Sequence, residues 1–542
     1  MCEEGGANLV RYLMGKALAV SDNQYKDVRN WSYKDIARLP QAEQKHWRLA
    51  CQEELDMLRK RKVFELVDRP RDRKVIKNRW VFDVKSDGHK KARLVAKGFS
   101  QVKGLDFDQV FSPVVRFETV RLMLALTALE DWYITGLDVR SAYLYGKLDE
   151  EIYMEQPEGF AAPRSQRKVL RLWRALYGLK QAGLAWWRTL DKSLQELGFE
   201  RLKSEAGIFI YMKKGTNIVI GIIYIDDTLF CGPNKAVVDS IKAQFMRKWE
   251  CQDLGEPKEF LRMRITRKGH AIHLDQCAYL QKIVERCGML NAKAASTPLP
   301  AGYYALANKD PVNPELHSRF QTVIESLLYL MLGTRPDIAF AVTHLSRHSA
   351  NLSQDHLNKA LYICRYLIGT STYSLVYNGG SGSGLTACTD SDWGSDPTSR
   401  LSQTGFYLKL ADGLISWTSH AQKTIVYSST EAEYMALSDC ARQVTWIRSL
   451  LGELSYKLKA IPICGDNQGS IFMASNPVTE PRSKHIDIRY HGIRELVAKG
   501  KVELYFIDGT ESPADLLTKN LPREKFVKFR AQLGLQFPSG SS

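Results

Sequence analysis

The sequence has no closely spaced cysteine pair and no long apolar run. Its 10 cysteines stand singly, with no Cys-x-x-Cys, which argues against a zinc knuckle or a disulfide scaffold and for reduced thiols. No stretch approaches the roughly 18 apolar residues of a membrane span. The first twenty residues carry acids and have no clean apolar core, so no signal peptide is evident. We therefore expect a soluble intracellular protein with no membrane partner.

Internal repeats, heptads and low-complexity domains are also missing, which excludes solenoids and coiled coils. The 542 residues exceed what one core can bury and predict roughly three or four domains. Lysine and arginine number 76 against 60 acids, a formal charge of +16. An excess of this size favours a polyanionic partner such as nucleic acid.

Two adjacent carboxylates follow the most apolar run of the chain. Residues 218–225 are almost entirely β-branched or aliphatic and end in Asp226 and Asp227, which predicts a buried strand that ends in two acids. An isolated Asp-Asp is more often a hairpin turn. With a third carboxylate nearby, however, the pair would form an oxygen cage suited to Mg²⁺.

Asp138 is the candidate third carboxylate. It lies at the end of a strand predicted over 132–139, and it would meet Asp226 and Asp227 if the two strands were neighbours. Three acids there would hold two metal ions for phosphoryl transfer. Taken alone, Asp138 is more simply a surface residue at a strand end.

A second group of acids follows the Gly/Ser tract at 379–384, which we predict to be a flexible linker. Four acids at predicted strand ends and helix starts suggest a second two-metal site: Asp390, Glu431, Asp466 and Asp515. Asp392 and Glu433 are second-ranked alternatives. Each acid alone would read as a helix cap, and Thr430 with Glu433 would make a capping box.

Several ordered motifs resemble one family. Residues 224–227 read Tyr-Ile-Asp-Asp, and 138–143 read Asp-Val-Arg-Ser-Ala-Tyr. Residues 91–101 read Lys-Ala-Arg-Leu-Val-Ala-Lys-Gly-Phe-Ser-Gln, 108–115 Asp-Gln-Val-Phe-Ser-Pro-Val-Val, and 176–182 Leu-Tyr-Gly-Leu-Lys-Gln-Ala. In this order they resemble the polymerase of copia-type long-terminal-repeat retrotransposons, from about Trp31 to Leu521.

The resemblance implies a role for each matching residue. Asp138, Asp226 and Asp227 would be the metal-binding catalytic carboxylates of a reverse transcriptase. Tyr143 would lie beneath the sugar of the incoming deoxynucleotide. The remaining nucleotide contacts would come from Arg93, with Lys97 assisting, and from Gln181.

The C-terminal unit resembles the ribonuclease H domain of the same polymerases. Its metal ligands would then be the four acids named above, and it would cut the RNA strand of an RNA–DNA hybrid with a water activated by Mg²⁺ or Mn²⁺. The implied partners are an RNA template, a DNA primer, the hybrid and deoxynucleoside triphosphates. The implied location is a cytoplasmic particle, the nucleus or both.

The implied fold is α+β, a right-hand polymerase followed by an α/β ribonuclease H-like domain. The expected segments are a lead-in over 1–40, fingers and palm over 41–296, thumb or connection over 297–378, the linker, the nuclease over 385–521 and a tail over 522–542. Helices are expected over 41–60, 117–129, most of 170–197, 236–249, 320–332, 356–367 and 428–446, and short strands over 63–96.

Some positions depart from the family pattern. Gly183 and Leu184 replace the usual Pro-Arg, and Arg262 stands where a glycine is common. These departures keep open an alternative class, a catalytically silent remnant that only binds nucleic acid. A plain DNA-directed polymerase is a third and weaker reading.

Overall fold

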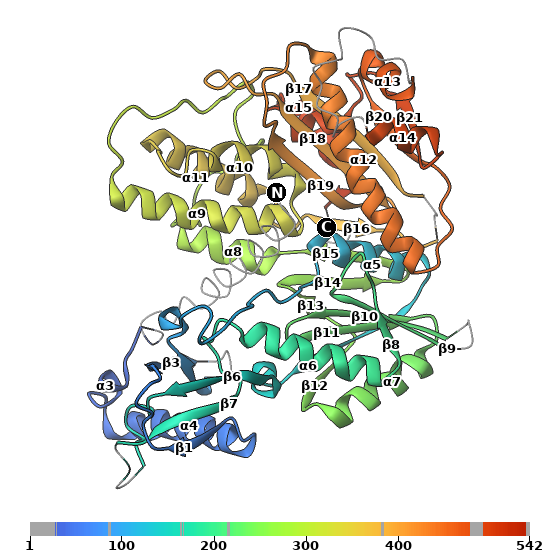
Figure 1. Cartoon of the computed structure of the whole chain (residues 1–542). Coiled ribbons are helices and arrows are strands. Elements are labelled where there is room, and N and C mark those ends of the chain that lie inside the picture. The colour runs from blue at the N-terminus through green and yellow to red at the C-terminus, as the bar shows by residue number, and fades with distance from the viewer. Residues whose placement is uncertain are drawn as a thin grey trace.

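The described residues of this computed structural model form helices and short strands, often in runs of one kind (Figure 1). The structure describes residues 28, 30–84, 88–162, 165, 167–213, 217–380, 384–476 and 492–537. The mixed α and β content agrees with the expected class. No helix within these ranges is long and apolar enough to cross a bilayer.

The N-terminal lobe, at the bottom of Figure 1, packs a helix against two small sheets. It contains α3 (Tyr33–Ile36), α4 (Gln41–Lys60), β1 (Phe64–Val67), β2 (Val75–Ile76), β3 (Asn78–Val84), β4 (Lys90–Ala96), β6 (Lys147–Met154) and β7 (Val169–Arg174). The buried stripe of α4 carries Trp47, Cys51, Leu55 and Leu58, as the helical spacing predicted. Strands β3 and β4 form a separate antiparallel hairpin.

A six-stranded antiparallel sheet forms the centre of the molecule, in the order β12-β5-β11-β10-β9-β8. Its strands are β5 (Tyr133–Val139), β8 (Phe199–Arg201), β9 (Ile208–Lys213), β10 (Asn217–Tyr224), β11 (Asp227–Gly232) and β12 (Cys251–Gly255). Helices α6 (Ala182–Glu196) and α7 (Lys235–Lys248) cover one face, and α5 (Phe117–Leu129) contributes to the core on the other. Strand β5 is an interior strand of this sheet and lies between β12 and β11.

A five-stranded sheet joins the middle of the chain to its end. It contains β13 (Glu259–Phe260), β14 (Met263–Lys268), β15 (Ala271–Asp275), β16 (Ser374–Tyr377) and β22 (Leu535–Gln536). Beside it lie α8 (Cys277–Arg286), α9 (Pro314–Gly333), η4 (Pro336–Ile338), α10 (Ala339–Ser346) and α11 (Gln354–Gly369).

The C-terminal unit is built on a five-stranded sheet in the order β19-β18-β17-β20-β21. Its elements are β17 (Thr386–Asp392), β18 (Gln403–Leu410), β19 (Gly413–Ala421), α12 (Ser429–Glu453), β20 (Ile461–Gly465), α13 (Gln468–Ser475), α14 (Gly492–Ala498), β21 (Val502–Phe506), η7 (Pro513–Leu517) and α15 (Arg523–Gln532). Because β17, β20 and β21 run parallel, their carboxyl ends meet at one edge of the sheet.

Two expectations need correction. The helix expected over most of 170–197 is α6, which begins only at Ala182, because Val169–Arg174 forms β7, which pairs with both β1 and β6. The C-terminal unit is also not held by a flexible linker alone. Arg121 of α5 donates to the Ile415 carbonyl of β19 at 2.9 Å, and the last strand, β22, pairs with β16. Of the predicted linker, residues 381–383 lie outside the described residues, as does most of the predicted lead-in.

Candidate active sites

Three aspartates meet at one end of the central sheet. Asp227 opens β11 and lies directly opposite Asp138 of β5 in the strand register. Asp226 occupies the turn before β11, where its carbonyl accepts a hydrogen bond from the Val139 amide at 2.9 Å. The predicted convergence of Asp138 with the Asp-Asp pair is thus present in the fold.

The crowding of these carboxylates is visible in their pKa values. Desolvation by the surrounding protein raises the pKa of Asp226 to about 6, and the charge of Asp138 adds to this effect, while Arg93 and Lys91 oppose it. Desolvation, Asp226 and Asp138 together raise the pKa of Asp227 to about 7. Asp226 remains accessible to solvent, so water screens part of this repulsion.

Clustered acids of this kind fit a divalent cation. Carboxylate oxygens are the preferred ligands of Mg²⁺, and a bound cation would remove the repulsion that raises both pKa values. The donor set is therefore chemically suited to a metal.

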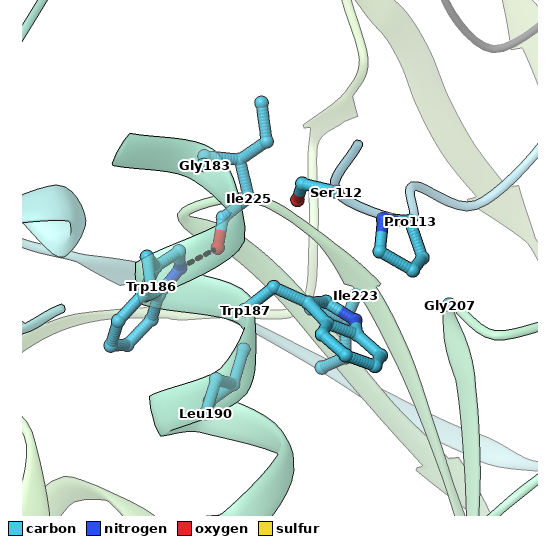
Figure 2. Close-up of a pocket in the computed structure, with 9 residues that line it drawn as sticks. All are labelled: Ser112, Pro113, Gly183, Trp186, Trp187, Leu190, Gly207, Ile223 and Ile225. Carbon is cyan, nitrogen blue, oxygen red and sulfur yellow. Dashed lines mark hydrogen bonds between the residues drawn. The ribbon is translucent and has the colours of Figure 1, made fainter. Parts of the chain in front are cut away.

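A hydrogen bond from Trp186 fixes the turn that carries Asp226. Ile225 has φ of 56°, the left-handed region that a β-branched residue rarely adopts. The Trp186 indole of α6 donates to the Ile225 carbonyl at 2.6 Å, as Figure 2 shows. Around this bond is a small pocket lined in part by Ser112, Pro113 and Gly207. Trp186 was not predicted as a site residue, because the bond joins segments far apart in the sequence.

Arg93 and Tyr143 both lie next to the ring of Tyr177. The Tyr143 ring packs edge-on against Tyr177, with 5.5 Å between centroids, and the Arg93 guanidinium lies 5.9 Å from the Tyr177 ring centroid. Arg93 is also close enough to lower the pKa of Asp226. The structure thus gathers Arg93 and Tyr143 beside the aspartates. Tyr177 was quoted within a motif but not predicted as a site residue.

Gln181 and Lys97 are placed differently. Gln181 is buried and its amide is engaged, since it accepts from Gln101 at 3.1 Å and donates to the Asp106 carbonyl at 2.7 Å. Its side chain therefore joins α6 to the segment that carries Gln101 and Asp106. Lys97 is half-buried at the end of β4, where its backbone amide donates to the Lys77 carbonyl at 2.8 Å.

A strained hairpin turn adds a cation near Asp227. Leu261 and Arg262, between β13 and β14, have φ of 51° and 57°, and Tyr329 donates to the Leu261 carbonyl at 2.6 Å. Arg262 lowers the pKa of Asp227 against the larger effect of desolvation. The departure at Arg262 thus costs backbone strain and supplies a positive charge beside the acids.

A second carboxylate cluster lies at the shared edge of the C-terminal sheet. Asp390 of β17, Glu433 of α12 and Asp466 after β20 each offer an oxygen, and these atoms lie within 4.8 Å of one another. Glu433 also accepts from the Ser391 amide at 2.9 Å. A bare glycine, Gly509, leaves room for Asp466, because a Cβ there would meet Asp466 Oδ2 at 2.9 Å.

The choice of Glu431 as the ligand in this cluster is wrong. Ser428 caps α12, and the Glu431 carboxylate folds back to accept from the Tyr427 amide at 2.9 Å. Two residues further on, the helix has turned by about 200°, so Glu433 faces β17. Glu433, which the sequence suggested for a capping box with Thr430, is therefore the glutamate that joins Asp390 and Asp466. Asp392, the other alternative, accepts from the Tyr304 hydroxyl at 2.7 Å.

Burial and mutual repulsion shape this cluster too. Burial is the main cause that raises the pKa of Glu433 to about 10, and the negative charges of Asp390 and Asp466 raise it further. Burial raises the pKa of Asp390 to about 7, although Lys519 opposes it. These three acids fit a divalent cation by the same reasoning as the first site.

Asp515, the fourth predicted acid, is only 2% exposed and lies in η7. Its two oxygens lie 2.7 Å from Lys519 Nζ and 2.6 Å from Lys525 Nζ. Neither lysine was predicted as a site residue, because single lysines among 76 basic residues give no local signal.

The chain has recognisable relatives. Residues 61–301 match the reverse transcriptase (RNA-dependent DNA polymerase) family. The Pol polyprotein of transposon TNT 1-94 from Nicotiana tabacum is 36% identical over 97% of this chain and 40% of its own length. The RE1 polyprotein of Arabidopsis thaliana is 35% identical over 90% of this chain and 34% of its own length. The transposon Ty5-1 protein YCL074W of Saccharomyces cerevisiae is 30% identical over 57% of this chain and its entire length.

The chain therefore spans well under half of the two plant polyproteins. Among solved structures, the foamy viral protease-reverse transcriptase dRH in complex with double-stranded DNA aligns with a TM-score of 0.43 and 13% identity, covering 84% of this chain and 69% of that one.

Proposed function

The chain belongs to the copia-type retrotransposon Pol family and carries its reverse transcriptase domain, and from this premise we propose that it copies RNA into DNA and degrades the RNA of the resulting hybrid. The observation that carries the proposal is the in-register pairing of Asp138 with Asp227, beside Asp226 at the adjacent turn. A decayed or repurposed fold would have no need to keep three mutually repelling acids together.

At the first site, the three aspartates would hold two divalent ions, Mg²⁺ or Mn²⁺. Such ions would supply activation of the primer 3′-hydroxyl and stabilisation of the departing pyrophosphate. The chain's own residues orient the acids: Trp186 fixes the turn and the strand pairing fixes Asp138.

The nucleotide side of this site is formed by Arg93, Lys97, Tyr143 and Gln181. Arg93 suits a triphosphate because its planar guanidinium can donate two parallel hydrogen bonds to phosphate oxygens. The Tyr143 ring, held by Tyr177, blocks a 2′-hydroxyl and so selects deoxynucleotides. Gln181 acts through the buried network around Gln101.

The β3–β4 hairpin and the central sheet serve as fingers and palm, and the helices α8 to α11 as thumb and connection. The C-terminal unit is the nuclease. Its divalent-ion ligands are Asp390, Glu433 and Asp466, with Asp515 at the edge of the cluster. It recognises the RNA strand of the hybrid through 2′-hydroxyls and helix shape. The reaction takes place inside the cell, in a cytoplasmic particle or the nucleus.

Matched asparagine variants test the two activities separately. Asp226→Asn should lose primer extension on an RNA template and keep hybrid cleavage, whereas Asp466→Asn should do the reverse. Asp239→Asn, which changes an acid of α7 paired with Lys235, is the control and should keep both. A wild-type protein that shifts hybrids on a gel but incorporates no labelled nucleotide would identify a binding remnant instead. Loss of both activities in each variant would reject two independent sites.

A further inference from the structure

The C-terminal cluster contains a lysine where a metal-binding site would be expected to hold only acids. Lys519 Nζ lies 2.7 Å from Asp515 Oδ1 and 3.7 Å from Asp390 Oδ2, so the ammonium bridges two carboxylates that are 2% and 1% exposed. Asp390 belongs to the group of three acids that fits a divalent ion, whereas Asp515 is outside that group. The lysine thus separates the fourth acid from the other three.

Local structure fixes this lysine in place. Lys519 follows the short η7 turn, and the amides of Thr518 and Lys519 both donate to the Asp515 carbonyl at 3.1 Å. The Thr518 hydroxyl donates to Asp390 Oδ2. Backbone and side chain therefore hold Asp515, Thr518 and Lys519 as one unit against β17.

The charges of the cluster match one divalent ion. Four carboxylates carry at most four negative charges, and the two lysines that contact Asp515, Lys519 and Lys525, offset two of these charges within the cluster. Two negative charges remain, on the side of Glu433 and Asp466. A second divalent ion between Asp390 and Asp515 would have to displace the Lys519 ammonium, because the ammonium already lies between these two carboxylates.

We propose that Lys519 takes the place of the second divalent ion, so that the C-terminal site binds one ion on Asp390, Glu433 and Asp466 and uses the ammonium as its other positive charge. The inference rests on the proposed nuclease function and revises the expectation of two metal ions there. Lys519, with 34% of its side chain exposed, is positioned to face the scissile phosphate of the RNA strand.

Counting Mn²⁺ ions by electron paramagnetic resonance tests this inference without reference to activity. The full-length chain is used with Asp226→Asn and Asp227→Asn, so that only the C-terminal site binds. We expect one Mn²⁺ with Lys519 present, two in Lys519→Met, and one in Lys519→Arg, which keeps the charge. Lys528→Met, which removes a lysine paired with Glu511 on α15, is the matched control and should bind one.

Each outcome is decisive. Two ions with Lys519 in place, or one ion in a folded Lys519→Met, would overturn the role of the lysine. If Lys519→Met does not fold, the count in the parent and Lys519→Arg proteins still decides, because two ions there reject the inference. No Mn²⁺ in any variant would instead reject the metal-dependent nuclease itself. Adding Asp466→Asn should remove the bound ion and so locate it.

Discussion

The fold disfavours the ionised forms of the Asp226 and Asp227 carboxyl groups. An unfolded aspartate titrates near pH 4, whereas the pKa values in the fold are about 6 and about 7. Between pH 4 and 7 these two side chains therefore bind more protons in the folded chain than in the unfolded chain. Their contribution to the free energy of unfolding of the metal-free protein should consequently fall as pH rises through this window.

Asp227→Asn removes one of these groups and should flatten that slope. Urea unfolding without metal should show the variant more stable than wild type at pH 8, with a smaller difference at pH 5. Asp253→Asn is a control of opposite sign, because a hydrogen bond from the Gly255 amide, the largest cause, holds the Asp253 pKa low. That variant should be less stable than wild type at pH 8. A difference in stability between Asp227→Asn and wild type that does not grow from pH 5 to pH 8 would contradict the raised pKa of Asp227.

Trp186 sets the position of Asp226 without touching it. Trp186→Phe removes the indole donor and leaves the Ile225 carbonyl without that bond, at a cost of roughly 1–3 kcal/mol. Primer extension should fall through kcat, with hybrid cleavage unchanged. Trp187→Phe is the neighbouring control, because the Trp187 indole has no hydrogen-bond partner among the described residues. Equal loss in both variants would show that bulk packing, not the hydrogen bond, positions the turn.

At the scale of elements, the β13–β14 turn combines strain with charge. Arg262→Gly should relieve a left-handed residue and stabilise the chain by about 1 kcal/mol. The same change removes the cation beside Asp227 and should weaken primer binding, measured as KM for the primer. Arg262→Lys keeps the charge and should retain the primer affinity. A glycine variant with unchanged KM and stability would show that the turn is neither strained nor functional.

Local patterns fixed most of the elements near the first site. The apolar run before Asp226 predicted β10, and the stripe of Trp47, Leu55 and Leu58 predicted α4. The helix expected over most of 170–197 begins only at Ala182, because pairing with β1 and β6 holds Val169–Arg174 as a strand. In the C-terminal unit the start of α12 was placed correctly to within a residue. Its facing acid was not, because helix phase decides between Glu431 and Glu433.

At the scale of the whole molecule, a buried arginine joins the C-terminal unit to the rest. Arg121 is 1% exposed, donates to the carbonyls of Ile415, Leu332 and Gly333, and stacks over Trp417 at 3.8 Å. The Trp417 indole in turn donates to the Met331 carbonyl at 3.0 Å. The C-terminal unit should therefore unfold together with the central sheet.

Arg121→Met tests this coupling. Methionine fills a similar volume but leaves the carbonyls of Ile415, Leu332 and Gly333 without their donor. The free energy of unfolding should therefore fall by roughly 3 kcal/mol or more. Calorimetry should show one transition in wild type and two in the variant. Arg59→Met, an exposed arginine paired with Asp56, should leave a single transition. Two transitions in wild type would mean that the units unfold independently.

The sequence by itself determined the kinds of residue available and the order in which they occur. Acids at strand ends, the basic excess and the ordered motifs follow from local composition and spacing, which also set strand and helix propensity. Only the tertiary structure decided which acids meet. Glu433 replaces Glu431, Lys519 enters a carboxylate cluster, Trp186 holds a distant turn and Arg121 joins two units, because each contact depends on packing between segments that are far apart in the chain.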